Sequence, residues 1–148
     1  MLKSLFGLLA NPRPEPADSD DVELALAALL VRLARSDGLY EESEQAHIDR
    51  LLIARNGIGP FEATALRRRA EALEDEAADT VRFTRALKDG IAHDDRMSVI
   101  EALWEVAMAD GARGAEEDSL IRLAANLLGI NDRDSALARQ RVIARLDD

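Results

Sequence analysis

Apolar residues recur every three or four positions along residues 20–146, which is the spacing of one face of an α-helix. In the first stretch, Val22, Leu26 and Leu33 share such a face. Ser, Thr, Asp or Pro opens most of these stretches, and Gly closes several of them, as expected at helix ends. The pattern predicts helices at about 19–37, 42–56, 60–73, 80–91, 95–110, 115–128 and 132–146.

The composition supports helices throughout. Ala and Leu dominate, whereas aromatic residues make up only 3% of the 148 residues, so strand-forming side chains are scarce. We predict an all-α domain over residues 18–148, a compact bundle of about seven or eight helices. In the last helix, Leu137, Leu146 and either Val142 or Ile143 are expected to face inward.

Residues 1–17 are predicted to be separate from that domain. Leu2, Leu5, Phe6 and Leu9 would share one face of a short apolar helix, and the prolines in residues 11–17 favour an extended linker behind it. Three fates are open to such a segment. It folds back onto its own bundle, docks on a partner, or touches a membrane surface.

The chain contains an internal repeat. A shift of 73 positions lays Asp37 on Asp110 and the helix before it on the helix before Asp110. The other pairs at this shift are Leu30 with Leu103, Leu33 with Val106, Ala34 with Ala107, Gly38 with Gly111, Glu44 with Glu117, and Ile48 with Ile121. Two pseudo-symmetric helix–Asp-Gly–helix hairpins, each too small to bury its own apolar face, are therefore expected to pack together.

These repeated residues resemble the tellurite-resistance TerB-like family, a domain also found in DnaJ-like co-chaperones. The resemblance rests on residues 33–38 followed by Glu44, and on residues 106–111 followed by Glu117. It extends over roughly residues 20–146. It implies a helical bundle, a cytoplasmic location and a link to metal or metalloid stress, but no known reaction.

Four carboxylates of the repeat form the candidate site: Asp37, Glu44, Asp110 and Glu117. Each Asp ends a helix, where the helix dipole disfavours negative charge, and each Glu lies in the first turn of the next helix. If the hairpins pack side by side, these oxygens could hold calcium, magnesium or zinc. Alternatively, the Asp side chains accept loop N–H hydrogen bonds and the Glu side chains cap their helices.

Other chemistries find little support in the sequence. There is no cysteine, and neither a nucleophile motif nor a phosphate-binding glycine loop is present. The Glu44-x-x-His47 pair has no second copy, as a di-iron site would require. Residues 67–69 are three arginines on a predicted solvated face, and a net charge of −10 disfavours nucleic acid. Trp104 is expected in the core, whereas Tyr40 is a candidate exposed contact.

The sequence thus favours a non-enzymatic, acidic binding module that acts in stress response. Its expected partner is a protein, either in a membrane-associated complex or as a homodimer. The expected location is the cytoplasm, free or at the periphery of the inner membrane. The alternative is a metal-dependent hydrolase that uses the carboxylate cluster.

Overall fold

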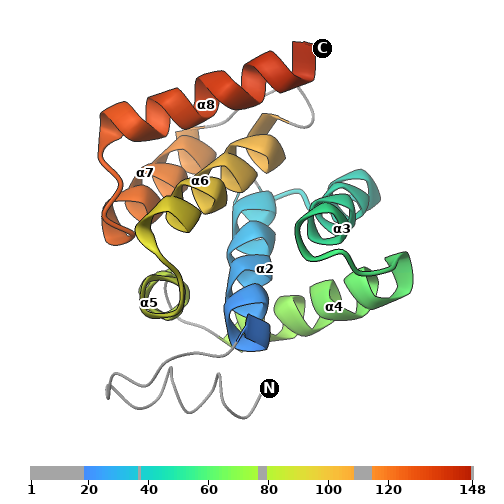
Figure 1. The fold of residues 1–148 in the computed structure, drawn as a ribbon. Helices are drawn as coiled ribbons and strands as arrows, with labels where there is room; N and C mark the ends of the chain where they lie inside the picture. Colours follow the sequence, from blue (N-terminus) through green and yellow to red (C-terminus); the bar gives the residue numbers. More distant parts are fainter. Residues whose placement is uncertain (1–18, 37, 77–79, 109–114, 148) are drawn as a thin grey trace.

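The computed structural model describes residues 19–36, 38–76, 80–108 and 115–147, and these residues contain seven helices and no strand (Figure 1). The all-helical prediction is confirmed. The helices are α2 (Ser19–Arg35), α3 (Glu42–Asn56), α4 (Pro60–Glu76), α5 (Val81–Gly90), α6 (His93–Met108), α7 (Ala115–Leu127) and α8 (Asp132–Asp147). The predicted apolar helix at residues 1–10 and its proline linker lie outside the described residues.

Left-handed glycines end the helices where the sequence predicts. Gly57 has a φ of 65°, and its N–H donates to the Ile53 carbonyl oxygen at 2.9 Å, which closes α3. Gly38 and Gly129 also have positive φ, at 85° and 76°. Because a side chain disfavours this conformation, glycine fits all three positions.

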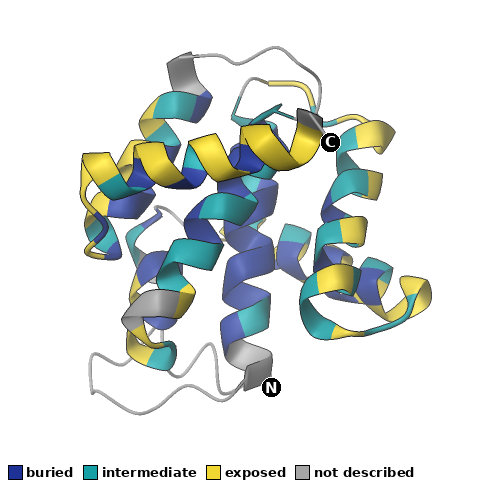
Figure 2. Ribbon diagram, turned by 45° about the horizontal axis from the view of Figure 1, so that its top comes forward, coloured by how far each residue is buried: buried dark blue, intermediate teal, exposed yellow. Residues whose placement is uncertain are grey.

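Helix α2 forms the centre of the bundle. It contacts α3, α4, α5, α6 and α7, and the burial view shows it dark blue along most of its length (Figure 2). The reason is its sequence. Residues 24–31 are all apolar, so this part of the helix has no polar face to present to water. The five helices that pack around α2 bury these side chains.

The repeat extends to a third helix in each half. The start of α3 at 42 corresponds to the start of α7 at 115, a shift of 73, and the start of α4 at 60 to that of α8 at 132, a shift of 72. In the first half, α4 packs on α2 and α3; in the second, α8 packs on α6 and α7. Helix α5 is the insertion that joins the two units, which are α2–α3–α4 and α6–α7–α8.

The inward face predicted for α8 is partly wrong. Val142 is buried as expected, but Leu137 and Leu146 are 38% and 56% exposed. Ser135, Ala138 and Val142, spaced by three and four residues, are the buried positions instead. Small side chains let α8 lie close to α6, and this rotation places the larger leucines outside.

Within the residues that the structure describes, no helix is both long and apolar enough to cross a membrane.

Candidate functional site

The loop after α2 carries the first half of the candidate site. Asp37 lies outside the described residues, but its neighbours are described. The Gly38 N–H donates to the Arg35 carbonyl oxygen at 3.0 Å, and Ser36 Oγ donates to the Leu33 carbonyl oxygen at 2.7 Å. These bonds satisfy two carbonyl groups at the end of α2 and make the loop tight.

Glu44 takes part in capping α3. The Glu41 N–H donates to Glu44 Oε1 at 3.3 Å, and Glu41 is the extended N-cap residue of the helix. The expectation that Glu44 caps its helix start is therefore confirmed.

Of the two carboxylates in the second half of the candidate site, Glu117 is the one that the structure describes. This residue lies in the first turn of α7 and is only 7% exposed. Asp110, like Asp37, lies outside the described residues. Helices α2 and α6 are in contact and run toward the end of the bundle drawn uppermost in Figure 1, so both hairpin loops follow helices that end on the same side.

The structure does not bring Glu44 and Glu117 together in one site. Among the described residues, α3 and α7 make no contact with each other. Nor do the described His, Asp and Glu side chains form a group of three or more that could hold a metal ion. Whether the two aspartates complete such a group stays a prediction, because neither is described.

A network of side-chain hydrogen bonds connects Tyr40, in the loop before α3, with residues of α3 and α4. Tyr40 donates its hydroxyl to Glu71 Oε2 at 2.5 Å, and Arg67 donates to Glu71 Oε2 and to Asp49 Oδ1, both at 2.7 Å. Thr64 Oγ1 adds a bond to Asp49 Oδ2 at 2.9 Å. The network ties the loop to α3 and α4.

Two predictions are corrected by this network. Tyr40 is half-buried rather than an exposed contact, and burial together with the Glu71 carboxylate raises its pKa well above the usual range. Arg67 is buried rather than solvated, with a side chain 9% exposed, whereas Arg68 and Arg69 are exposed as predicted. Burial lowers the pKa of Arg67, but its bonds to Asp49 and Glu71 outweigh that effect and raise it.

A second cluster of charges lies at the end of α2. Arg32 Nε and Arg35 Nη1 bind the two oxygens of Glu74 at 3.0 and 2.6 Å. The same guanidinium groups lie over aromatic rings, Arg32 over Phe83 at 5.2 Å and Arg35 over Tyr40 at 4.9 Å. Arg32 and Arg35 lie in the last turn of α2, where their positive charge interacts favourably with the negative end of the helix dipole.

His47 has a local role in this structure. Its Nδ1 lies 3.3 Å from Arg50 Nη2, and burial followed by the Arg50 charge lowers its pKa below the ordinary value. Trp104 is buried as predicted, and its Nε1 donates to the Ser135 carbonyl oxygen at 3.2 Å.

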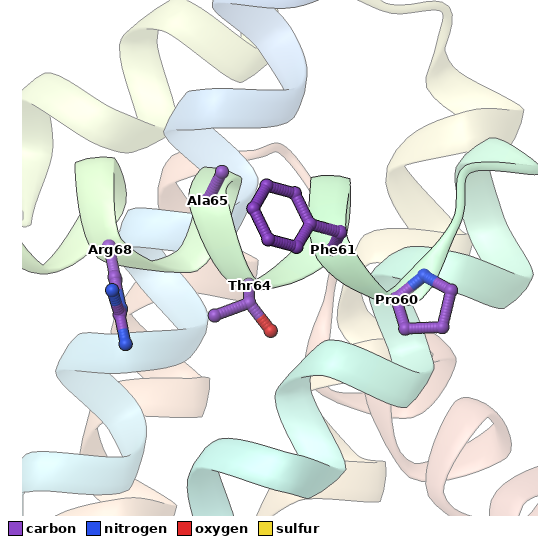
Figure 3. A pocket seen from close by; sticks show the side chains of 5 residues that line it. All are labelled: Pro60, Phe61, Thr64, Ala65 and Arg68. Carbon is purple, nitrogen blue, oxygen red and sulfur yellow. The ribbon is translucent and has the colours of Figure 1, made fainter.

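The largest exposed apolar side chain among the described residues is Phe61, at 89% exposure. It lies at the start of α4 beside a shallow hollow lined by Pro60, Phe61, Thr64, Ala65 and Arg68 (Figure 3). Sequence reasoning missed this residue, because it follows Pro60 at the predicted helix start and carries no periodic signal. A single exposed aromatic residue defines no ligand.

The fold defines a class of protein, a helical module made of two three-helix units, and the sequence places an Asp-Gly pair after the first helix of each unit. A family model described as Tellurite resistance protein TerB matches residues 23–140. The chain belongs to this TerB family. Comparisons with curated proteins and with solved structures gave no match.

Proposed function

We propose that this chain is a non-enzymatic binding module of the tellurite-resistance response, and that it binds a divalent cation through its two hairpin loops. The observation that supports this proposal most is where α2 and α6 end. In the sequence an Asp-Gly pair follows each of these helices and a glutamate lies in the first turn of the next helix, and α2 and α6 end on the same side of the bundle (Figure 1).

Electrostatics favours a cation at this end. Asp37 and Asp110 follow the negative ends of α2 and α6, where a carboxylate is disfavoured by roughly 0.3–1 kcal/mol. With a net charge of −10, the chain also repels itself. A bound calcium, magnesium or zinc ion would offset both costs, and carboxylate oxygens are suitable ligands for these ions.

The metal proposal is tested by thermal unfolding. Millimolar calcium, magnesium or zinc should raise the Tm of the wild type, because a ligand that binds only the folded state stabilises it. The double variant Asp37→Asn/Asp110→Asn should lose the shift. The control Asp89→Asn/Asp132→Asn makes the same change in net charge at two exposed positions and should keep it. An equal shift in both double variants, or none in the wild type, contradicts the site.

The proposal that the module is not an enzyme rests on its side chains. The sequence has no cysteine, only two histidines, and no nucleophile motif. A metal-dependent hydrolase is the competing function. Phosphatase and esterase substrates, offered with Mg²⁺ or Mn²⁺, should show no turnover. Turnover that disappears in Asp110→Asn would replace the binding module by the hydrolase.

The biological role is proposed from the family. The name of the matching model points to tellurite resistance, and we infer a cytoplasmic module that acts through a protein partner, in a membrane-associated assembly or as a homodimer. Expression of the wild type in a tellurite-sensitive host should improve growth on tellurite. The Asp37→Asn/Asp110→Asn variant, present at the same level, should not. Equal growth with both would separate the role from the carboxylates.

A further inference from the structure

A pocket of about 240 Å³ lies between the helices of the second unit. Its lining comes from α6, α7 and α8 and includes Trp104, Asp118, Arg122, Asp132, Ala136 and Arg139. Pockets for small-molecule ligands usually measure roughly 300–1,000 Å³. The size of this pocket therefore suits a small chemical group rather than a cofactor.

The corresponding residues of the first unit surround a carboxylate of the chain itself. Asp49 of α3 accepts hydrogen bonds from two residues of α4. Arg67 Nε donates to Asp49 Oδ1 at 2.7 Å, and Thr64 Oγ1 donates to Asp49 Oδ2 at 2.9 Å. Arg67 also donates to Glu71 Oε2 at 2.7 Å. The arginine of the first unit thus has two carboxylate partners.

The second unit keeps this arginine but neither of its carboxylates. At the shift of 73 for the first pair and 72 for the others, the four positions correspond as Asp49 to Arg122, Thr64 to Ala136, Arg67 to Arg139 and Glu71 to Ile143. Helix α7 therefore carries a second donor, Arg122, at the position where α3 carries the acceptor Asp49.

Arg139 lacks an acceptor within the part of the chain that the structure describes. Its Nε is buried and has no hydrogen-bond partner there, and neither Arg139 nor Arg122 takes part in an ion pair of the described residues. Arg139 Cζ lies over the Trp104 ring, 5.8 Å from its centroid. This contact uses the face of the guanidinium group, whereas its N–H donors lie in the plane of the group. Buried donors are normally hydrogen-bonded, so the plane lacks an acceptor.

We propose that this pocket binds a carboxylate group from outside the chain, at the position that the Asp49 carboxylate has in the first unit. The oxygens of the ligand accept hydrogen bonds from the guanidinium groups of Arg122 and Arg139. A planar carboxylate matches the fork of donors that each arginine presents. The first unit provides the internal example of this pairing, with Arg67 on Asp49.

Two aspartates of the lining limit the affinity. Asp118 and Asp132 balance the charges of the two arginines, and the chain as a whole carries a net charge of −10, so net charge does not draw anions into the pocket. Selection then depends on the geometry of the donors, which favours a carboxylate over a spherical ion such as chloride. Asp118 lies four residues before Arg122 on α7, so an ion pair within this helix is the competing arrangement.

An NMR titration of the full chain with sodium acetate tests the proposal. The Nε–H signal of Arg139 and the indole N–H signal of Trp104 should shift saturably, because both groups belong to residues that line the pocket. The Nε–H signal of Arg67 should stay in place, since its acceptor is internal. Sodium chloride at the same ionic strength is the control. Equal shifts with chloride would reduce the effect to salt screening and overturn the proposal.

The variant Arg122→Asp gives the second unit the same acid and arginine as the first. Its new carboxylate should pair with Arg139, and acetate should bind at least about tenfold more weakly than to the wild type. The matched control is Arg69→Asp, which makes the same change in net charge at an exposed position of α4 and should keep the binding. Undiminished binding to Arg122→Asp, or an equal loss in both variants, contradicts the site.

A second ligand distinguishes the sources of the carboxylate. N-acetyl-aspartate amide, in which the side chain is the only carboxylate, replaces acetate in the same titration. If it binds at least as tightly as acetate, the natural ligand is an acidic side chain of a protein. Binding of acetate alone identifies a small organic acid. If neither compound shifts the Arg139 signal, Asp118 or solvent satisfies the arginines and the proposal is wrong.

Discussion

The two three-helix units share a backbone plan but differ in how charge stabilises them. In α2–α4, Arg67 is 9% exposed and holds carboxylates that are themselves 18% and 20% exposed. In α6–α8, Arg141 and Arg145 are 56% and 53% exposed where they bind Glu101 and Glu105. The first unit thus contains a buried network, and the second a set of surface ion pairs.

Equivalent positions show how this difference arises. Arg67 corresponds to Arg139 at the shift of 72, and Asp49 corresponds to Arg122 at the shift of 73. The attractive pair of the first unit is a pair of like charges in the second. Arg139 lies instead over the Trp104 ring at 5.8 Å. A cation–π contact has therefore taken the place of an ion pair in the duplicated unit.

The comparison teaches that the repeat preserves the apolar spacing and the left-handed glycines, while the polar contacts diverge. Packing position depends on spacing along a helix, which the repeat keeps. A polar contact depends on the identity of one partner on another helix, so a single substitution is enough to change it.

The largest effect is expected at Arg67. Arg67→Ala leaves Asp49 and Glu71 without their partner in a partly buried site and should cost about 3 kcal/mol of unfolding free energy. The matched change Arg145→Ala removes an exposed partner and should cost no more than about 1 kcal/mol. Urea unfolding measures both. Equal losses would remove the distinction between the units.

The glycines are expected to behave alike in both units. Gly57→Ala and Gly129→Ala force a side chain into the left-handed region, and each should cost about 1 kcal/mol. Gly59→Ala is the control, since its backbone has no positive φ and an added Cβ meets only Glu62 Oε1, at 3.8 Å. Thermal or urea unfolding of the three variants compares them. A large loss only at Gly57 would mean that the second unit ends α7 differently.

Trp104 tests a contact found only in the second unit, since Val31 stands at its position in the first. Trp104→Phe keeps an aromatic ring but loses the hydrogen bond from Nε1 to the Ser135 carbonyl oxygen, at a cost of about 1 kcal/mol. Ser135→Ala keeps that carbonyl and should cost less. A larger loss in Ser135→Ala would show that the hydroxyl group, at 3.3 Å, is the acceptor that matters.

The smallest effect concerns pH. The folded-state pKa of His47 lies below 6.5, so the unfolded chain takes up a proton first as pH falls. Stability that is present above pH 6.5 should therefore decrease as pH falls from 6.5 toward the folded-state pKa. His47→Leu, which copies Leu120 of the second unit, should flatten this part of the profile of Tm against pH. An unchanged slope would assign it to another group.

The sequence predicts the helices well because apolar spacing, prolines and glycines are local signals. The starts of α3 and α7 and the buried Trp104 were all readable in this way. Arg67 was not, because its partner Asp49 lies on another helix, although Glu71 four residues later gave a local hint. The face of α8 was misjudged because small side chains, not the leucines, determine how closely it packs on α6.

For the candidate site too, the local features could be predicted from the sequence and the tertiary arrangement could not. The capping role of Glu44 follows from its place in the first turn of α3, and the structure confirms it. Convergence of the two loops depends on how the units pack against each other, and spacing within one chain segment does not encode that. The carboxylates could therefore be selected from the sequence, but whether they converge could not be derived from it, and their convergence stays a prediction.

Binding of Mn²⁺, followed by paramagnetic broadening of backbone amide NMR signals, tests the central claim most directly. If the two loops form one site, the amides of Gly38, Glu44 and Glu117 should broaden together at substoichiometric Mn²⁺, while those of α4 and α5 stay sharp. The Asp37→Asn/Asp110→Asn variant should lose this selective broadening. Broadening of one loop alone, or even broadening over the acidic surface, would contradict a shared site.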